Sequence, residues 1–253
     1  MVSLEKRIQD GAPKLISLVK PLRVELEKRN LLDVTARVAL VVDISGSMNR
    51  SYKDGTVQEI VNKLLPVAVQ FDDDGALDFW FYGTTCERRP PVNMSNYESA
   101  IPDDWKKIRE RIGGVNNEPA VMEEVIAEFA ESTLPVYVVF VTDGGISKTA
   151  QIKKLLIEAS YQPIFWQFVG VRGKDYGILE KFDTLKERYV DNANFFALDD
   201  FSSVPNDELY SRLLDEFPTW LAAIKGNGVL DGSVRQTTDD LLARLRRYFG
   251  FDS

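Results

Sequence analysis

Acidic and hydroxyl side chains follow two separate apolar runs of the chain. Asp43, Ser45 and Ser47 alternate directly after the first run, and Asp143 comes directly after a later one. Carboxylate and hydroxyl oxygens, without imidazole or thiolate, are the donor set that suits Mg²⁺, Mn²⁺ or Ca²⁺. If the fold brings the two segments together, we expect a divalent-cation site there, with Mg²⁺ as the first candidate.

The same residues also have a purely structural interpretation. Asp43 and Asp143 could each cap the helix that follows, with Ser45 and Ser47 filling turn positions. Capping explains one such segment well. Two segments of this kind in one chain favour a shared site.

The elements that must position these residues follow from hydrophobic patterning. Apolar runs rich in β-branched residues predict strands at residues 38–42, 76–82, 136–141, 164–169 and 194–198. Helical patterns lie between or after them, at residues 57–71, 105–112, 119–131, 149–160, 174–182 and 205–225. This alternation predicts a doubly wound α/β domain, with a mainly parallel sheet and helices on both faces. Ligands of such sheets bind at the carboxyl ends of the strands, where the acidic residues lie.

Three parts of the chain are expected. Residues 1–32 predict an N-terminal helical extension in which Pro21 produces a kink or break. Residues 33–228 form the α/β domain, and residues 229–253 form a C-terminal tail with a short helix.

Composition excludes several functions. The 253 residues are 44% hydrophobic and 28% charged, as in ordinary globular proteins. A formal net charge of −8 argues against binding to nucleic acid or to an anionic membrane surface. With no histidine and one cysteine, Cys86, the chain has no Ser-His-Asp or Cys-His machinery, no internal disulfide and no His- or Cys-based metal cluster. The charged start of the chain and the lack of a long apolar run predict a cytoplasmic protein.

Two motifs together resemble a known family. Asp43-x-Ser45-x-Ser47 after an apolar strand, with Thr142-Asp143-Gly144 at the end of a later strand, resembles the metal-ion-dependent adhesion site of von Willebrand factor A domains. Further stretches resemble the TerF-type branch, which is associated with bacterial tellurium resistance; they lie at residues 52–58, 71–75, 116–119 and 208–221. The resemblance implies the Rossmann-like fold of that family over roughly residues 33–230.

The resemblance implies a metal-dependent protein-interaction module and not an enzyme. By analogy Ser45 and Ser47 bind the cation directly. Asp43 and Asp143 either bind it directly or lie next to the groups that bind it. An Asp or Glu of a partner protein would take the open position on the metal. Family association suggests other tellurium-resistance proteins as partners, and a role in tellurite and stress resistance.

The chain departs from the family pattern at Val115. Many A domains supply a threonine hydroxyl here, from a Gly-Gly-Thr loop, whereas this chain has Gly-Gly-Val. Asn116 or Asn117 could offer an amide oxygen instead, or a water could fill the gap. Glu118 could also coordinate, although a third carboxylate would weaken attraction for an acidic partner. The alternative is a plain helix start with asparagine as its cap.

Two other functions remain open at this stage. A structural assembly subunit could share the fold and carry a vestigial metal loop. A metal-dependent phosphoryl-transfer enzyme of the haloacid dehalogenase kind needs a second carboxylate two residues after the first, where this chain has Ser45. Loss of that general acid costs about 10²–10⁴-fold in rate, which disfavours the enzyme.

Overall fold

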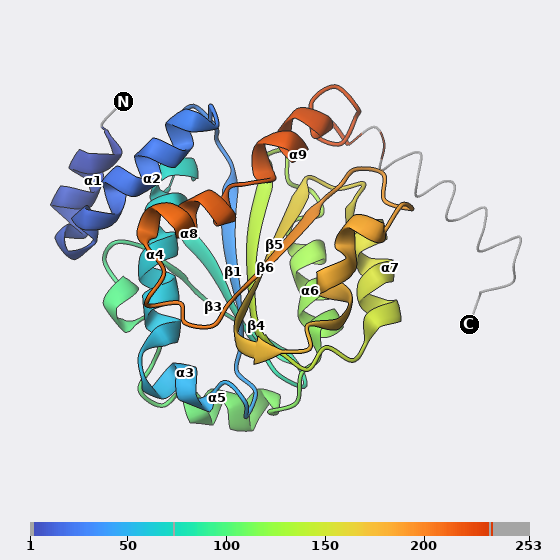
Figure 1. Cartoon of the computed structure of the whole chain (residues 1–253), viewed down its shortest axis with the longest axis horizontal. Helices are drawn as coiled ribbons and strands as arrows, with labels where there is room; N and C mark the ends of the chain where they lie inside the picture. The colour runs from blue at the N-terminus through green and yellow to red at the C-terminus, as the bar shows by residue number, and fades with distance from the viewer. Residues whose placement is uncertain (1–2, 73, 233, 235–253) are drawn as a thin grey trace, which may run out of the picture.

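A six-stranded sheet organises the chain, of which the computed structural model describes residues 3–72, 74–232 and 234. The strand order is β3-β2-β1-β4-β5-β6 (Figure 1). All neighbouring strands are parallel except β2 and β3, which are antiparallel. The strands are β1 Arg37–Asp43, β2 Leu77–Tyr82, β3 Cys86–Val92, β4 Val136–Gly144, β5 Ile164–Lys174 and β6 Ala193–Leu198. The predicted doubly wound α/β fold is confirmed.

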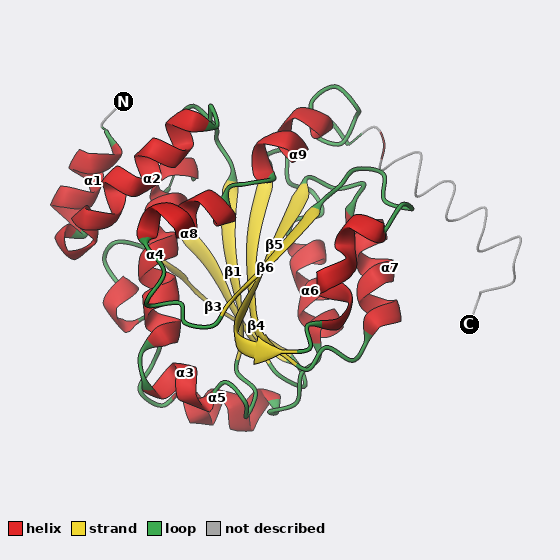
Figure 2. Cartoon of the chain, viewed as in Figure 1, coloured by secondary structure: helices red, strands yellow, loops and turns green. Residues whose placement is uncertain are grey.

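Helices cover both faces of the sheet and lie across the carboxyl ends of its strands (Figure 2). One face is covered by α1 Leu4–Gly11, α2 Ile16–Lys28, α4 Thr56–Phe71 and α8 Asn206–Leu213. The other face is covered by α6 Glu118–Glu128 and α7 Thr149–Ala159. At the carboxyl ends of the strands lie α3 Asn49–Lys53 and α5 Trp105–Ile112. The remaining helices are α9 Phe217–Ile224 and the short 3-10 helices η1 Pro13–Leu15, η2 Tyr97–Ser99 and η3 Gly177–Thr184.

The central strand β1 shows why the sheet needs two helical layers. Val38, Leu40 and Val42 pack into the apolar cluster beneath α2, α4 and α8. Ala39 and Val41 point the opposite way, into the cluster beneath α6 and α7. All five are fully buried, because successive side chains of a strand alternate between faces. An unbroken apolar run is therefore the pattern expected of this position.

The strand β3 is the one strand that the sequence pattern does not predict. Its sequence contains Arg88, Arg89, Pro90 and Pro91, which are typical of a loop. Proline lacks the N–H that a central strand donates, so it is tolerated only where one side of the strand is unpaired. Here β3 is an edge strand paired with β2, and Arg88 forms an ion pair with Asp78 at 3.0 Å.

Three helix predictions need correction. The predicted helix 205–225 is two helices, α8 and α9, and Pro218 lies in the first turn of α9, as is common for proline. The predicted helix 174–182 is replaced by the end of β5 and by η3. Pro21 lies inside a continuous α2, and the break comes earlier, between α1 and η1. The short helix expected in the tail lies largely beyond residue 234 and outside the described residues.

The N-terminal helices belong to the main core. Leu22 and Leu26 of α2 are fully buried in the same apolar cluster as β1 and α4. Arg29, just after α2, binds Glu25 and donates a 3.0 Å hydrogen bond to the carbonyl oxygen of Ser211 in α8. Within the described residues no helix combines the length and the apolar character that a membrane span requires.

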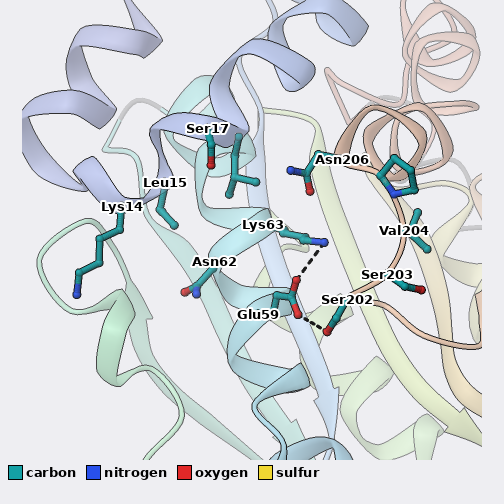
Figure 3. A pocket seen from close by; sticks show the side chains of 12 residues that line it. Lys14, Leu15, Ser17, Glu59, Asn62, Lys63, Ser202, Ser203, Val204 and Asn206 are labelled. Carbon is teal, nitrogen blue, oxygen red and sulfur yellow. Dashed lines mark hydrogen bonds and ion pairs between the residues drawn. The ribbon is translucent and has the colours of Figure 1, made fainter.

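An open pocket of about 490 Å³ lies between α2, α4 and the segment that leads into α8 (Figure 3). Its charged groups are already paired: Lys63 Nζ lies 3.2 Å from Glu59 Oε1, and the other oxygen of Glu59 accepts a hydrogen bond from Ser202. None of the four predicted metal ligands lines this pocket. The candidate site therefore lies elsewhere, at the ends of the strands.

Candidate functional site

Asp43 ends β1 and directs its carboxylate into the interior. The residue is fully buried, and its Oδ1 accepts a 2.6 Å hydrogen bond from the backbone N–H of Ser45. Its Oδ2 is also buried and has no hydrogen-bond partner. A buried polar atom without a partner costs free energy, and a role in binding an ion would account for it.

The two serines connect this loop to the end of β4. Ser45 Oγ and Ser47 Oγ lie 2.9 Å apart, and Ser47 Oγ donates a 2.9 Å hydrogen bond to Asp143 Oδ1. Parallel pairing of β1 with β4 sets the two strand ends side by side. The structure thus brings together all four residues that the sequence singled out at the strand ends.

Glu118 adds a third carboxylate near these residues, and like Asp43 it is buried. It is the first residue of α6 and is 1% exposed, yet neither of its carboxylate oxygens has a hydrogen-bond partner. The sequence marks Glu118 only as a possible ligand. Glu118 is buried because α6 packs against β2. The sequence around Glu118 does not predict this packing.

Burial dominates the electrostatics of the three carboxylates, and Lys148 offsets it only in part at Glu118. Burial, together with the charges of Asp143 and Glu118, raises the pKa of Asp43 to about 7, against the hydrogen bonds from Ser45 that lower it. Burial also raises the pKa of Glu118 and that of Asp143. A bound cation would reverse this effect, because it favours the ionised form of each carboxylate.

The donor set fits a metal only with the hydroxyl groups included. Among residues 3–72, 74–232 and 234, no group of three or more His, Cys, Asp or Glu side chains is arranged to hold a metal ion. A cation at this position would therefore draw on the hydroxyl oxygens of Ser45 and Ser47. Hydroxyl and carboxylate oxygens together suit Mg²⁺, which keeps several of its waters.

The loop before α6 closes one side of the site. The backbone N–H of Gly46 donates a 3.3 Å hydrogen bond to the carbonyl oxygen of Gly114, which holds this loop beside the serines. Gly113 has φ +82°, and a side chain here would clash with Thr84. Val115 is 71% exposed and brings no side-chain oxygen.

Asn116 and Asn117 brace the site by hydrogen bonding. Asn116 Nδ2 donates to the carbonyl oxygen of Gly144 at 2.9 Å. Asn117 Nδ2 donates to the carbonyl oxygen of Thr84 at 2.8 Å, while its Oδ1 accepts from Lys148 Nζ at 2.7 Å. The amide oxygen of Asn117 is thus engaged by a lysine, which makes Asn116 the better candidate of the two for an additional ligand.

The sequence analysis did not predict the side chains that support the loop of residues 43–47 from outside. The hydroxyl of Tyr52 donates a 2.9 Å hydrogen bond to the carbonyl oxygen of Asp43, and its ring stacks on Trp105 with centroids 4.6 Å apart. Arg109 Nη1 donates to Asn49 Oδ1 at 2.7 Å, just after the loop. Only the helical spacing of Trp105, Ile108 and Ile112 hints at this packing.

Known proteins resemble this chain in sequence and in fold. The uncharacterized protein YcbR of Bacillus subtilis (strain 168) is 41% identical over 215 residues, which cover 83% of this chain and 88% of that protein. The crystal structure of VWA2, an ArnB paralog from Sulfolobus acidocaldarius, has a TM-score of 0.50 at 14% identity. That match covers 72% of this chain but only 45% of the archaeal chain, and it shows the fold alone.

The family follows from the sequence comparison. Residues 35–230 match the family described as the vWA found in the TerF C terminus. This range contains every strand of the sheet and every residue of the candidate site. The chain therefore belongs to the TerF-like family of von Willebrand factor A domains.

Proposed function

We propose that this protein is an interaction module that binds a divalent cation, Mg²⁺ first, through Asp43, Ser45, Ser47 and Asp143. Through the cation it binds an Asp or Glu carboxylate of a partner protein. One observation carries the proposal: Asp43 Oδ2 is buried without a partner beside two hydroxyls and a second carboxylate. Membership of the von Willebrand factor A family supports it, because such domains often mediate metal-dependent protein interactions.

The chemistry of the site fits recognition better than catalysis. When bound, the cation supplies a positive centre that attracts an external carboxylate. Ser45 and Ser47 contribute oxygens without charge, so they leave that attraction intact. The N–H of Ser45 donates a hydrogen bond to the carboxylate of Asp43, and the hydroxyl of Tyr52 donates one to its backbone carbonyl oxygen. Both hydrogen bonds hold Asp43 in place. These residues orient and bind; the chain has no histidine, and its one cysteine, Cys86, is not among them.

The wider biological role is proposed from the family name alone. The TerF connection suggests bacterial tellurite and stress resistance, with other tellurium-resistance proteins as partners in the cytoplasm. A direct test is affinity capture from lysate with Mg²⁺ or EDTA, followed by identification of proteins retained only with Mg²⁺.

Calorimetric titration tests the metal site. The chelator-stripped protein is titrated with Mg²⁺ and with Mn²⁺, beside Asp43→Asn and the matched control Asp10→Asn, which makes the same chemical change at an exposed position of α1. We expect saturable one-site binding that Asp43→Asn loses and Asp10→Asn retains. If the wild-type protein binds neither ion, alone or with an acidic peptide, a structural assembly subunit with a vestigial loop becomes the better account.

A further inference from the structure

We propose that α3 and α5 carry a cationic ledge, formed by Arg50, Lys53, Lys106 and Arg109, that binds further carboxylates of the partner segment. The inference rests on the proposed function, because one carboxylate of the same segment would sit on the metal. The partner is therefore a protein segment with several acidic residues in a row, and not one with an isolated Asp or Glu.

The ledge lies next to the metal loop. Helix α3 begins two residues after Ser47, and α5 lies beside it at the carboxyl ends of the strands (Figure 1). Two contacts join the helices: the stack of Tyr52 on Trp105 and the 2.7 Å hydrogen bond from Arg109 to Asn49. A segment bound at the loop would therefore lie close to these two helices.

The cations occupy matched positions on the two helices. Arg50 and Lys53 are three residues apart on α3, and Lys106 and Arg109 are three residues apart on α5. Residues at this spacing share one side of a helix. Lys106 Nζ and the Arg109 guanidinium lie 5.7 and 5.2 Å from the centroid of the Trp105 ring, so both stay close to the junction with α3.

These side chains have almost no acidic partners. In the described part of the chain, no carboxylate oxygen lies within 4.0 Å of the charged nitrogens of Lys53, Lys106 or Arg109. Arg50 lies 3.9 Å from Asp54, whose carboxylate is also bound by Arg172. Arg50, Lys53 and Lys106 are solvent-exposed, while Arg109 is half-buried.

Neighbouring charges do not cancel the ledge. On the same two helices Lys107 is paired with Asp104 at 3.3 Å and Arg111 with Glu87 at 2.6 Å, so these pairs are neutral. Glu110 is the remaining acidic residue of α5, and it is exposed. The four ledge cations therefore leave a local excess of positive charge on a chain whose net charge is −8. A concentrated charge of the opposite sign to the whole protein favours an anionic ligand at that place.

An acidic protein segment fits this surface better than a nucleic acid does. Most of the surface of a strongly acidic chain repels a long polyanion, whereas a short acidic segment need touch only the ledge. The planar guanidinium of Arg109 suits a carboxylate, which it can bind with two parallel hydrogen bonds. The adjoining metal position would take one more carboxylate.

Fluorescence anisotropy with a labelled peptide tests the ledge. The probe is a short peptide with a central run of Asp and Glu, compared with a peptide that has one Asp among neutral residues. The proteins are wild type, Lys53→Gln/Lys106→Gln, and the matched control Lys6→Gln/Lys20→Gln, whose lysines are exposed on α1 and α2. Each protein is measured with Mg²⁺ or EDTA, at low and at high salt.

We expect the ledge variant to bind the acidic-run peptide about tenfold more weakly at low salt, and the difference to shrink at high salt. Binding of the single-Asp peptide, and binding by the control variant, should change by less than about twofold. Calorimetric Mg²⁺ affinity should be unchanged or tighter in the ledge variant, because removing positive charge favours a cation.

The outcomes separate the two proposals. If Mg²⁺ binds but the ledge and control variants bind the acidic-run peptide equally, the ledge is overturned and the metal site stands. The ledge is likewise overturned if the wild-type protein with Mg²⁺ bound does not bind the acidic-run peptide. If no Mg²⁺ binds, the proposed function fails. The inference that one acidic segment binds both the metal and the ledge then fails with it. If a single-stranded oligonucleotide displaces the peptide at equal concentration, the ledge is a general polyanion site instead.

Discussion

Replacing Asp43 by asparagine should stabilise the metal-free protein and abolish the extra stability that Mg²⁺ confers. Asparagine keeps an oxygen that can accept the 2.6 Å hydrogen bond from the N–H of Ser45. It removes a negative charge from a fully buried position where one carboxylate oxygen has no partner. A residue that costs stability and is needed for binding is what a ligand site would contain.

The magnitude follows from the pKa of Asp43, which rises from 3.8 to about 7. At about 1.36 kcal/mol per pKa unit, this corresponds to about 4 kcal/mol of lost stability when the carboxylate is fully ionised. The new amide N–H₂ group is itself buried, at a cost of about 1–3 kcal/mol if it finds no acceptor. We therefore expect a net gain of about 1–3 kcal/mol, or roughly 3–9 °C in melting temperature for a chain of this size.

The gain should depend on pH in a defined direction. Between the pKa of the unfolded chain, near 4, and the folded value of about 7, native Asp43 retains a proton that the unfolded chain has released. The unfolded state then binds fewer protons, so the stability of the metal-free wild type falls as pH rises through this window. Asp43→Asn lacks this contribution, and its advantage should grow from about pH 4 to about pH 8.

Thermal unfolding in EDTA and in excess Mg²⁺ measures both halves of the prediction. Mg²⁺ should raise the melting temperature of the wild type and of Asp10→Asn, because ligand binding stabilises the folded state by mass action. It should leave Asp43→Asn unchanged. A variant that melts below the wild type in EDTA near pH 8 would refute the reasoning about the buried carboxylate.

Three further variants probe the same molecule. Val115→Thr should tighten Mg²⁺ binding by calorimetry, because it restores a hydroxyl at the departure from the family pattern; equal or weaker affinity would place the loop away from the ion. Glu118→Gln should raise the melting temperature in EDTA and weaken Mg²⁺ binding by up to about tenfold, because it removes a buried charge that attracts the cation. An unchanged affinity would show that Glu118 does not sense the metal. Burial and the neighbouring Glu124 raise the pKa of the Cys86 thiol to about 12, so thiol reagents should react slowly near pH 8 and faster in Glu124→Gln; rapid labelling of the folded wild type would contradict this.

The sequence alone was sufficient to predict how the acidic strand ends meet. β1 and β4 are buried on both faces, so their apolar runs stand out, and parallel strands place Asp43 and Asp143 at one end of the sheet. The alternation of Ser45 and Ser47 then brings both hydroxyls to the same side of the turn. Local pattern and global topology agree at this point, which is why the geometry could be anticipated.

The surroundings of the site could not be anticipated, because they depend on packing between distant segments. The arginines and prolines of the edge strand β3 are not typical of a strand, so the sequence does not predict the path of the chain from β2 to α5. That path brings the end of α5 back to the turn after β2, where Thr85 donates a 2.8 Å hydrogen bond to the carbonyl oxygen of Ile112. The position of Arg109 beside the loop of residues 43–47 follows from this return and from no local motif.

The charges at this end of the sheet explain why an ion and an acidic ligand would bind together. Inside are the buried carboxylates of Asp43 and Glu118 and the half-buried carboxylate of Asp143, all with raised pKa values. Outside are the cations of the ledge. Among the described residues, the only ion pair of a ledge cation is that of Arg50 with Asp54, at 3.9 Å. Burial separates the two sets, so they do not neutralise each other despite their proximity. A divalent cation would satisfy the inner set but leave the outer one unpaired, and an acidic segment alone would do the reverse. Only both ligands together balance this end of the sheet, so each should strengthen the binding of the other.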